Sequence, residues 1–169
     1  MNRHPGGEEH TRRMLALAER FGLPEGARIL DMGAGAGETV RLLREEGFEA
    51  EGIDLKPRSE LVRTGDMHRT GLPDECFDAV VSQCAFFVSG DPEAAGREAR
   101  RVLKSGGLLL LSDIFFDEPV LPGFQILYRE DITPVWREYY IEALWRGDCS
   151  GCEIPRGKSR YLAVVAKKE

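Results

Sequence analysis

Apolar and polar positions follow two alternating patterns along the chain. Short, nearly continuous apolar runs are typical of buried strands and predict seven of them, at residues 27–32, 48–55, 60–66, 76–83, 107–116, 123–130 and 160–168. Apolar residues spaced three and four apart predict helices at residues 8–22, 37–47, 92–105 and 132–147. Because strands and helices alternate, the pattern predicts an α/β fold built around a mostly parallel sheet.

Two connections between predicted strands are unusually short. Parallel neighbouring strands normally need a crossover of a dozen or more residues, often a helix. Only KPRSE, residues 56–60, lies between the second and third strands, and only DEPVLPG, residues 117–123, between the fifth and sixth. Extended chain covers roughly 3.3 Å per residue, so such links can span a strand without a helix. We expect shortened, extended crossovers after strands 2 and 5.

Length and net charge limit the number of domains in the chain and the kinds of partner that it can bind. A chain of 169 residues suits one domain with a sizeable core, covering residues 1–169. A net charge of −6 argues against nucleic acid as the main partner. The chain has no run of about 18 apolar residues, and its start, MNRHPGGEEHTRR, lacks the apolar core of a signal peptide. We expect a cytoplasmic protein without a membrane or nucleic-acid partner.

The stretch RILDMGAGAGETVRLL, residues 28–43, joins a predicted strand to a predicted helix through a glycine-rich turn. Such turns cradle ligands, because glycine permits close approach and free helix N–H groups attract negative charge. A P-loop would need Lys and Ser or Thr where Glu38 and Thr39 stand, and the dinucleotide fingerprint would need Gly or Ala at Glu38. Asp31 suits a cationic group instead, and Asp54, about twenty residues beyond the first glycine, suits ribose hydroxyls. The ligand class that remains is a nucleoside without phosphate.

Four segments in order carry a resemblance to a known family. ILDMGAGAGE, GIDL, GDMHRTGLPDECFDAVVS and EARRVLKSGGLLLLSD resemble the class I S-adenosylmethionine-dependent methyltransferases, specifically their type 11-like domain. The resemblance implies a Rossmann-like, doubly wound sheet with a final antiparallel strand. It divides the chain into an N-terminal helix (1–24), a cofactor-binding core (28–116) and a substrate-side region (117–169). It also implies an enzyme, a monomer or homodimer, that methylates a small-molecule acceptor and converts S-adenosylmethionine to S-adenosylhomocysteine.

The resemblance also assigns the cofactor-binding residues. It places Asp31 and the turn glycines at the methionine moiety, Asp54 at the ribose, Leu55 against adenine, and Asp66 at the adenine amino group. Gln83 and Cys84, just past the fourth strand, would flank the sulfonium. The full predicted set is Asp31, Gly33, Ala34, Gly35, Asp54, Leu55, Gly65, Asp66, Met67, Gln83 and Cys84.

Catalytic candidates are sought where parallel strands end, because open α/β sheets bind ligands there. Cys84 follows the fourth strand, Asp113 lies near the C-terminal end of the fifth, and His68 flanks the third. An activated methyl group mainly needs alignment with the acceptor atom, and a base helps only where that atom carries a proton. Cys84, His68 and Asp113 are therefore the predicted catalytic residues, whereas His10 is expected to be exposed.

Other functions remain open at this stage. A shortened domain of this kind could bind the nucleoside or a partner protein without catalysis, and an NAD-dependent oxidoreductase is a further alternative. The sequence around Cys84 is similar to arsenite methyltransferases, which suggests that Cys84, Cys149 and Cys152 supply thiolates to a soft acceptor. A zinc site needs four ligands, and the sequence has neither a second CxxC nor a His pair, so no metal is predicted.

Overall fold

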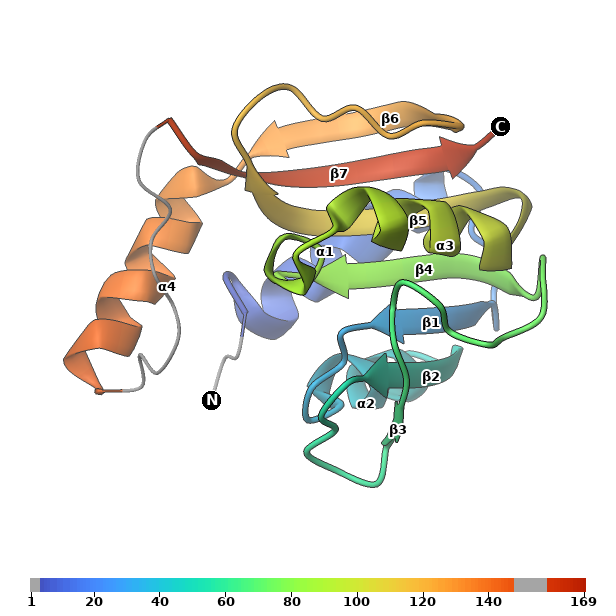
Figure 1. Cartoon of the computed structure of the whole chain (residues 1–169), viewed down its shortest axis with the longest axis horizontal. Coiled ribbons are helices and arrows are strands. Elements are labelled where there is room, and N and C mark those ends of the chain that lie inside the picture. The colour runs from blue at the N-terminus through green and yellow to red at the C-terminus, as the bar shows by residue number, and fades with distance from the viewer. Residues whose placement is uncertain (1–3, 148–157) are drawn as a thin grey trace.

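The strands form one seven-stranded sheet in the order β3-β2-β1-β4-β5-β7-β6 (Figure 1). It is seen in a computed structural model that describes residues 4–147 and 158–169. The strands are β1 (Arg28–Met32), β2 (Glu49–Asp54), β3 (Val62–Thr64), β4 (Phe77–Gln83), β5 (Leu103–Phe115), β6 (Phe124–Asp131) and β7 (Arg160–Lys168). β1 to β5 pair in parallel, and β7 runs antiparallel to both of its neighbours. The predicted fold class, including its antiparallel last strand, is confirmed.

Helices cover both faces of the sheet. In the view of Figure 1, α1 (Gly7–Arg20) and α2 (Glu38–Glu45) lie behind the sheet, and α3 (Pro92–Val102) lies in front. α4 (Thr133–Trp145) projects from the edge where the parallel strands end, and a short 3-10 turn, η1 (Phe87–Ser89), follows β4. No helix in the described part of the chain is long and apolar enough to cross a membrane.

Alternation of side chains along the central strands creates two separate cores. On β5, Leu108 and Leu110 join the cluster that packs α1 and α2, whereas Leu109 and Leu111 join the cluster that packs α3. Successive strand residues point to opposite faces, so a strand covered on both sides must be apolar throughout. This requirement explains the continuous apolar run from which the strand is predicted.

The third predicted helix ends earlier than the sequence pattern indicates. The prediction extends it to residue 105, but α3 ends at Val102 and β5 begins at Leu103. Leu103 has an extended backbone (φ −72°, ψ 136°) and pairs with Phe77. Burial of Leu103 in the sheet therefore outweighs the helical preference of the Lys-Ser segment that follows it.

The two shortened crossovers are confirmed. Residues 55–61, after β2, and residues 116–123, after β5, contain no helix. Residues 65–76, between β3 and β4, likewise lack a helix. The sheet is therefore covered by fewer helices than its parallel strands would ordinarily have.

The helix-free segment before β4 is attached to α3 through one carboxylate. Glu98 is buried, and its Oε1 accepts hydrogen bonds from the backbone N–H and the hydroxyl of Thr70, each 2.7 Å long. Arg101 donates to both oxygens of Glu98, at 2.7 and 2.9 Å. The hydrogen bond from Arg101, followed by those from Thr70, lowers the pKa of Glu98 to about 2.

This network makes stability depend on pH in a defined window. Because the folded pKa lies below the ordinary value of 4.5, Glu98 stabilises the fold fully above pH 4.5, and its contribution is lost as pH falls through about 2. We expect Glu98→Gln to lower the free energy of unfolding at pH 7 by about 1–3 kcal/mol. Urea titrations at pH 7 and pH 3 would measure this, and the difference from wild type should shrink at pH 3. Glu93→Gln, at an exposed carboxylate of the same helix, is the matched control, and an equal loss there would contradict the assignment.

Candidate functional site

The glycine turn between β1 and α2 approaches the end of β4 closely. Gly33 and Gly35 have φ values of 90° and 54°, which side-chain-bearing residues rarely adopt. A Cβ on residue 33 would lie only 2.4 Å from the Cβ of Ala85, which follows β4. The turn therefore requires glycine both for its backbone and for this contact. It lies where the strand order changes direction, which is where open parallel sheets bind ligands.

Two adjacent cavities open around this turn. The larger has a volume of about 280 Å³ and the smaller about 60 Å³, and Gly33, Gly35 and Arg58 line both. The larger is also lined by Ile53, Asp54, Leu55, Gly65, Asp66, Met67, His68, Cys84, Ala85, Val88 and Ser89. The smaller is also lined by His4, Asp31, Ala34, Ala36, Glu38, Thr39 and Gln83. Every predicted cofactor-binding residue thus lines one of two neighbouring cavities.

Asp31 carries a buried carboxylate toward the smaller cavity. It is only 4% exposed, and within the described residues it forms no hydrogen bond or ion pair. Burial raises the pKa of Asp31 to about 7, and the charge of Asp54 contributes to this rise. A buried acid without a partner is costly, and a positively charged ligand group would relieve that cost.

Asp54 is held in place at the end of β2 by the backbone. One of its oxygens accepts the N–H of Gly35 at 2.9 Å, and the other accepts the N–H of Lys56 at 2.8 Å. A carboxylate oxygen can accept more than one hydrogen bond, so each oxygen can also accept a ligand hydroxyl. Leu55 next to it is 65% exposed and offers an apolar surface on the cavity wall.

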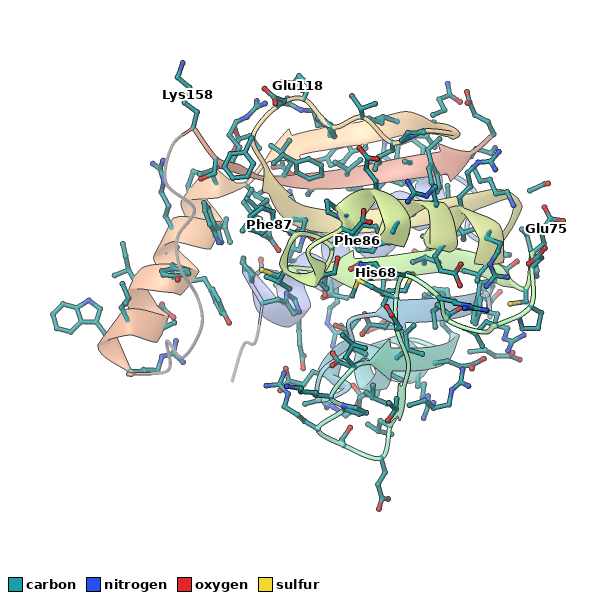
Figure 2. All side chains as sticks on the ribbon, viewed as in Figure 1. His68, Glu75, Phe86, Phe87, Glu118 and Lys158 are labelled. Carbon is teal, nitrogen blue, oxygen red and sulfur yellow. The ribbon has the colours of Figure 1, made fainter. Side chains whose placement is uncertain are left out.

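Asp66 and His68 form the far side of the larger cavity. An oxygen of Asp66 accepts the backbone N–H of His68 at 2.8 Å and lies 3.4 Å from its Nδ1. The Nε2 of His68 lies 3.0 Å from the hydroxyl of Ser89, beside the η1 turn where Phe86 and Phe87 also gather (Figure 2). These contacts fix the imidazole at the cavity wall.

Cys84 occupies the left-handed backbone region, with φ of 58°, immediately after β4. Its N–H donates to the carbonyl of Ser112 at 2.8 Å, and it lines the larger cavity. The neighbouring Gln83 faces the smaller cavity, where it accepts a hydrogen bond from Thr39 and donates one to Thr11. A strained backbone held by its surroundings is typical of functional sites.

Comparison with known proteins identifies a family. The sequence matches the family described as a methyltransferase domain over residues 30–111. It is 34% identical over 133 residues to demethylmenaquinone methyltransferase from Corynebacterium urealyticum, covering 72% of this chain and 53% of that protein. It is 26% identical to arsenite methyltransferase from Mus musculus, covering 92% of this chain and 48% of that protein.

A solved structure agrees in fold. Phosphoethanolamine N-methyltransferase 2 from Haemonchus contortus, in complex with phosphomonomethylethanolamine and S-adenosylhomocysteine, matches with a TM-score of 0.71 at 19% identity. The match covers 98% of this chain and 54% of that one. Residues 30–111 of the chain therefore belong to the methyltransferase-domain family. The chain spans about half the length of the curated relatives it matches.

Asp113 does not line the cavity that His68 and Cys84 share. Its carboxylate accepts the N–H of Phe87 at 3.1 Å and that of Ile114 at 2.8 Å, and it lines neither cavity at the glycine turn. Burial raises its pKa to about 6, although the backbone N–H groups act in the opposite direction. The geometry therefore brings two of the three predicted catalytic residues together. Cys149 and Cys152 lie outside the described residues.

Two residues of the methyltransferase site carry no clear signal in the sequence. The N–H of Arg58 donates to the carbonyl of Gly35 at 2.9 Å, so the shortened crossover lies directly over the glycine turn. His10 was expected to be exposed, but it is buried, with Nε2 2.7 Å from the hydroxyl of Ser112, and burial lowers its pKa to about 4. In the described part of the chain, no three His, Cys, Asp or Glu residues could hold a metal ion together.

Asp31 is buried and has no hydrogen bond or ion pair within the described residues, so its replacement should change the free energy of unfolding in an unusual direction. The folded protein holds this proton more tightly than the unfolded chain, so stability falls as pH rises from 3.8 to about 7. We expect Asp31→Asn to be more stable than wild type at pH 8 by about 1–3 kcal/mol, and similar to it below pH 4. Chemical unfolding at both pH values would test this, with the exposed Glu25→Gln as control. A variant less stable than wild type at pH 8 would show that Asp31 has a stabilising partner.

Proposed function

We propose that this methyltransferase transfers the methyl group of S-adenosylmethionine to a small-molecule acceptor. The observation that carries the proposal is the buried carboxylate of Asp31 beside the glycine turn, which has no hydrogen bond or ion pair within the described residues. S-adenosylmethionine supplies an activated methyl group on a sulfonium sulfur. Its amino-acid part carries a positive charge, which would be a partner for the carboxylate of Asp31.

The remaining cavity residues would hold the rest of the cofactor. Asp54 would accept hydrogen bonds from the ribose hydroxyls, because its oxygens already have a fixed position. Asp66 would accept from the adenine amino group, and Leu55 would pack against the ring. The backbones of Gly33, Ala34, Gly35, Gly65 and Met67 and the side chains of Gln83 and Cys84 would complete the contact surface.

The chain's contribution to the reaction would be alignment and, for a protonated acceptor, removal of a proton. His68 is the candidate base, because its ring is held at the wall of the cavity by Asp66 and Ser89. Cys84 would lie beside the methyl group and face the acceptor. Asp113 would act indirectly, because it holds the backbone turn that follows Cys84.

Cofactor binding is the first testable step. We expect wild type to bind S-adenosylhomocysteine in calorimetric titration, and Asp54→Ala to bind it at least tenfold more weakly because the ribose would lose its acceptors. Glu25→Ala is the control at an exposed position. Stabilisation by NAD instead of S-adenosylhomocysteine in thermal unfolding would contradict the assignment. Binding without production of S-adenosylhomocysteine across an acceptor panel would favour a binding module.

A thiol-coordinated soft acceptor is a second candidate, favoured by the position of Cys84 in the lining of the larger cavity. The arsenite methyltransferase from Mus musculus is a relative of this chain. If arsenite is the acceptor, it should stimulate S-adenosylhomocysteine production, and Cys84→Ser should reduce this at least tenfold through loss of a thiolate ligand. Calorimetric binding of S-adenosylhomocysteine to the variant is the control for site integrity. Unchanged turnover in Cys84→Ser would remove this candidate.

A further inference from the structure

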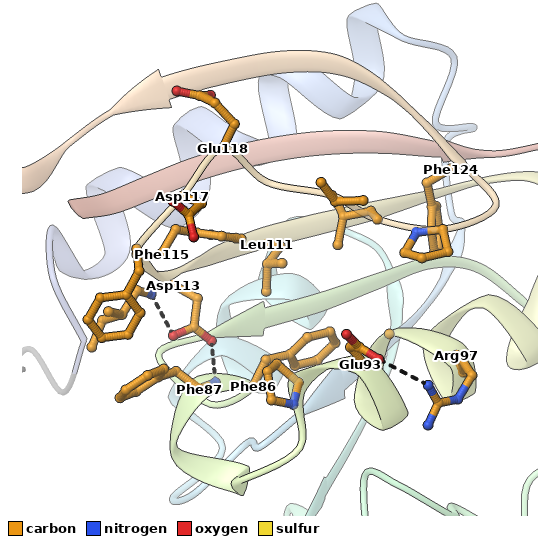
Figure 3. A pocket seen from close by; sticks show the side chains of 17 residues that line it. Phe86, Phe87, Glu93, Arg97, Leu111, Asp113, Phe115, Asp117, Glu118 and Phe124 are labelled. Atoms are coloured by element: carbon orange, nitrogen blue, oxygen red, sulfur yellow. Dashed lines mark hydrogen bonds and ion pairs between the residues drawn. The ribbon is translucent and has the colours of Figure 1, made fainter. Parts of the chain in front are cut away.

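A second, larger opening lies beside the cofactor cavities. It is a groove of about 510 Å³ between α3, the η1 turn, the end of β5 and residues 116–123 (Figure 3). Its lining is mostly apolar: Phe86, Phe87, Pro92, Gly96, Leu111, Ile114, Phe115, Phe116, Val120, Leu121, Pro122 and Phe124, with Glu93, Arg97, Asp113, Asp117 and Glu118. This volume falls within the range of roughly 300–1,000 Å³ that is usual for small-molecule sites.

The groove exists because the crossover after β5 is short. Residues 116–123 run as an extended link, so no helix packs beside α3 on this face of the sheet. Phe87 and Phe116, both in the lining, form a tilted aromatic pair with ring centroids 5.8 Å apart. Val120 on the rim is 82% exposed. Apolar surface that a helix would otherwise cover therefore remains accessible.

Gly96 keeps the groove open from the side of α3. It lies in the middle of the helix, where glycine costs about 1 kcal/mol relative to alanine. Its φ is not positive, and a Cβ added there would meet nothing within 4 Å. Neither backbone geometry nor packing within the chain requires glycine at this position. A side chain would instead project into the groove that Gly96 lines.

The charges around the groove select against anions. Among the described residues, Arg97 is the only cation in the lining, and it pairs with Glu93 at 3.7 Å. Glu118 is paired from outside the lining by Arg129 and Arg160. An anionic ligand would therefore find no unpaired cation in the lining, whereas the aromatic walls suit an apolar or cationic group.

One turn separates the groove from the cofactor cavity. Phe86 and Phe87 line the groove, whereas Ala85, Val88 and Ser89, in the same short segment, line the larger cavity. We propose that the groove binds the apolar body of the methyl acceptor, an uncharged or cationic amphipathic small molecule. This inference rests on the proposed methyl transfer, because it names the class of acceptor.

Displacement of the neutral dye Nile red from the full chain tests the groove. The competitors are 1-decanol, decylamine and decanoate, which share an apolar chain and differ in charge at pH 7, each below its micelle concentration. We expect decanol and decylamine to displace the dye at concentrations at least tenfold lower than decanoate. Gly96→Phe fills the groove and should weaken dye binding at least tenfold, whereas Gly96→Ala should stay within twofold of wild type.

Calorimetry with S-adenosylhomocysteine keeps the two proposals apart. We expect Gly96→Phe to bind S-adenosylhomocysteine within twofold of wild type, which also shows that the variant is folded. Val120→Glu, at an exposed rim position, should weaken decanol binding at least threefold without touching the core. Equal affinity for decanoate, or unchanged dye binding in Gly96→Phe, would overturn the groove assignment. Failure of the wild-type protein to bind S-adenosylhomocysteine would instead overturn the proposed function.

Discussion

The site depends on the close approach of the glycine turn to the end of β4. A side-chain carbon at Gly33 would lie 2.4 Å from the Cβ of Ala85, so the two segments can meet only at glycine. β1 and β4 are neighbours at the point where the strand order changes direction, and ligands of open parallel sheets bind there. This contact brings the ends of three strands to one place. Asp31, Asp54 and Cys84 come to line adjoining cavities for that reason.

The two shortened crossovers have opposite effects on the surface. Residues 55–61 lie directly over the glycine turn, where Arg58 donates to the carbonyl of Gly35 and Ser59 donates to that of Ala36. That link therefore closes one wall of the cofactor site. Residues 116–123 leave the neighbouring sheet face partly uncovered and so create the apolar groove. An extended link in place of a helix narrows the site at the glycine turn in one case and leaves the groove open in the other. The effect differs because it depends on which part of the protein the link packs against.

Two buried aspartates show how partners decide the role of a residue. Burial raises the pKa of both Asp31 and Asp113. Asp113 is stabilised by backbone N–H groups of the segment after β4, so its charge is used within the fold. Asp31 forms no such bond within the described residues, so its charge is available to a ligand. Both residues lie near the C-terminal ends of apolar strands, and only their surroundings distinguish them.

The sequence by itself determined the order of strands and helices and the shortened crossovers, because these follow from local periodicity. Its motifs around residues 31–38, 54 and 66 also pointed to residues that line the two cavities. It placed the end of α3 too late, because the pairing of Leu103 with a distant strand is not a local property. Only the tertiary structure decided that His10 is buried against Ser112, that Asp113 lines the groove and not the cavity of His68 and Cys84, and that this groove opens beside Gly96. Each of these depends on segments far apart in the sequence that pack together, and local patterns carry no record of such contacts.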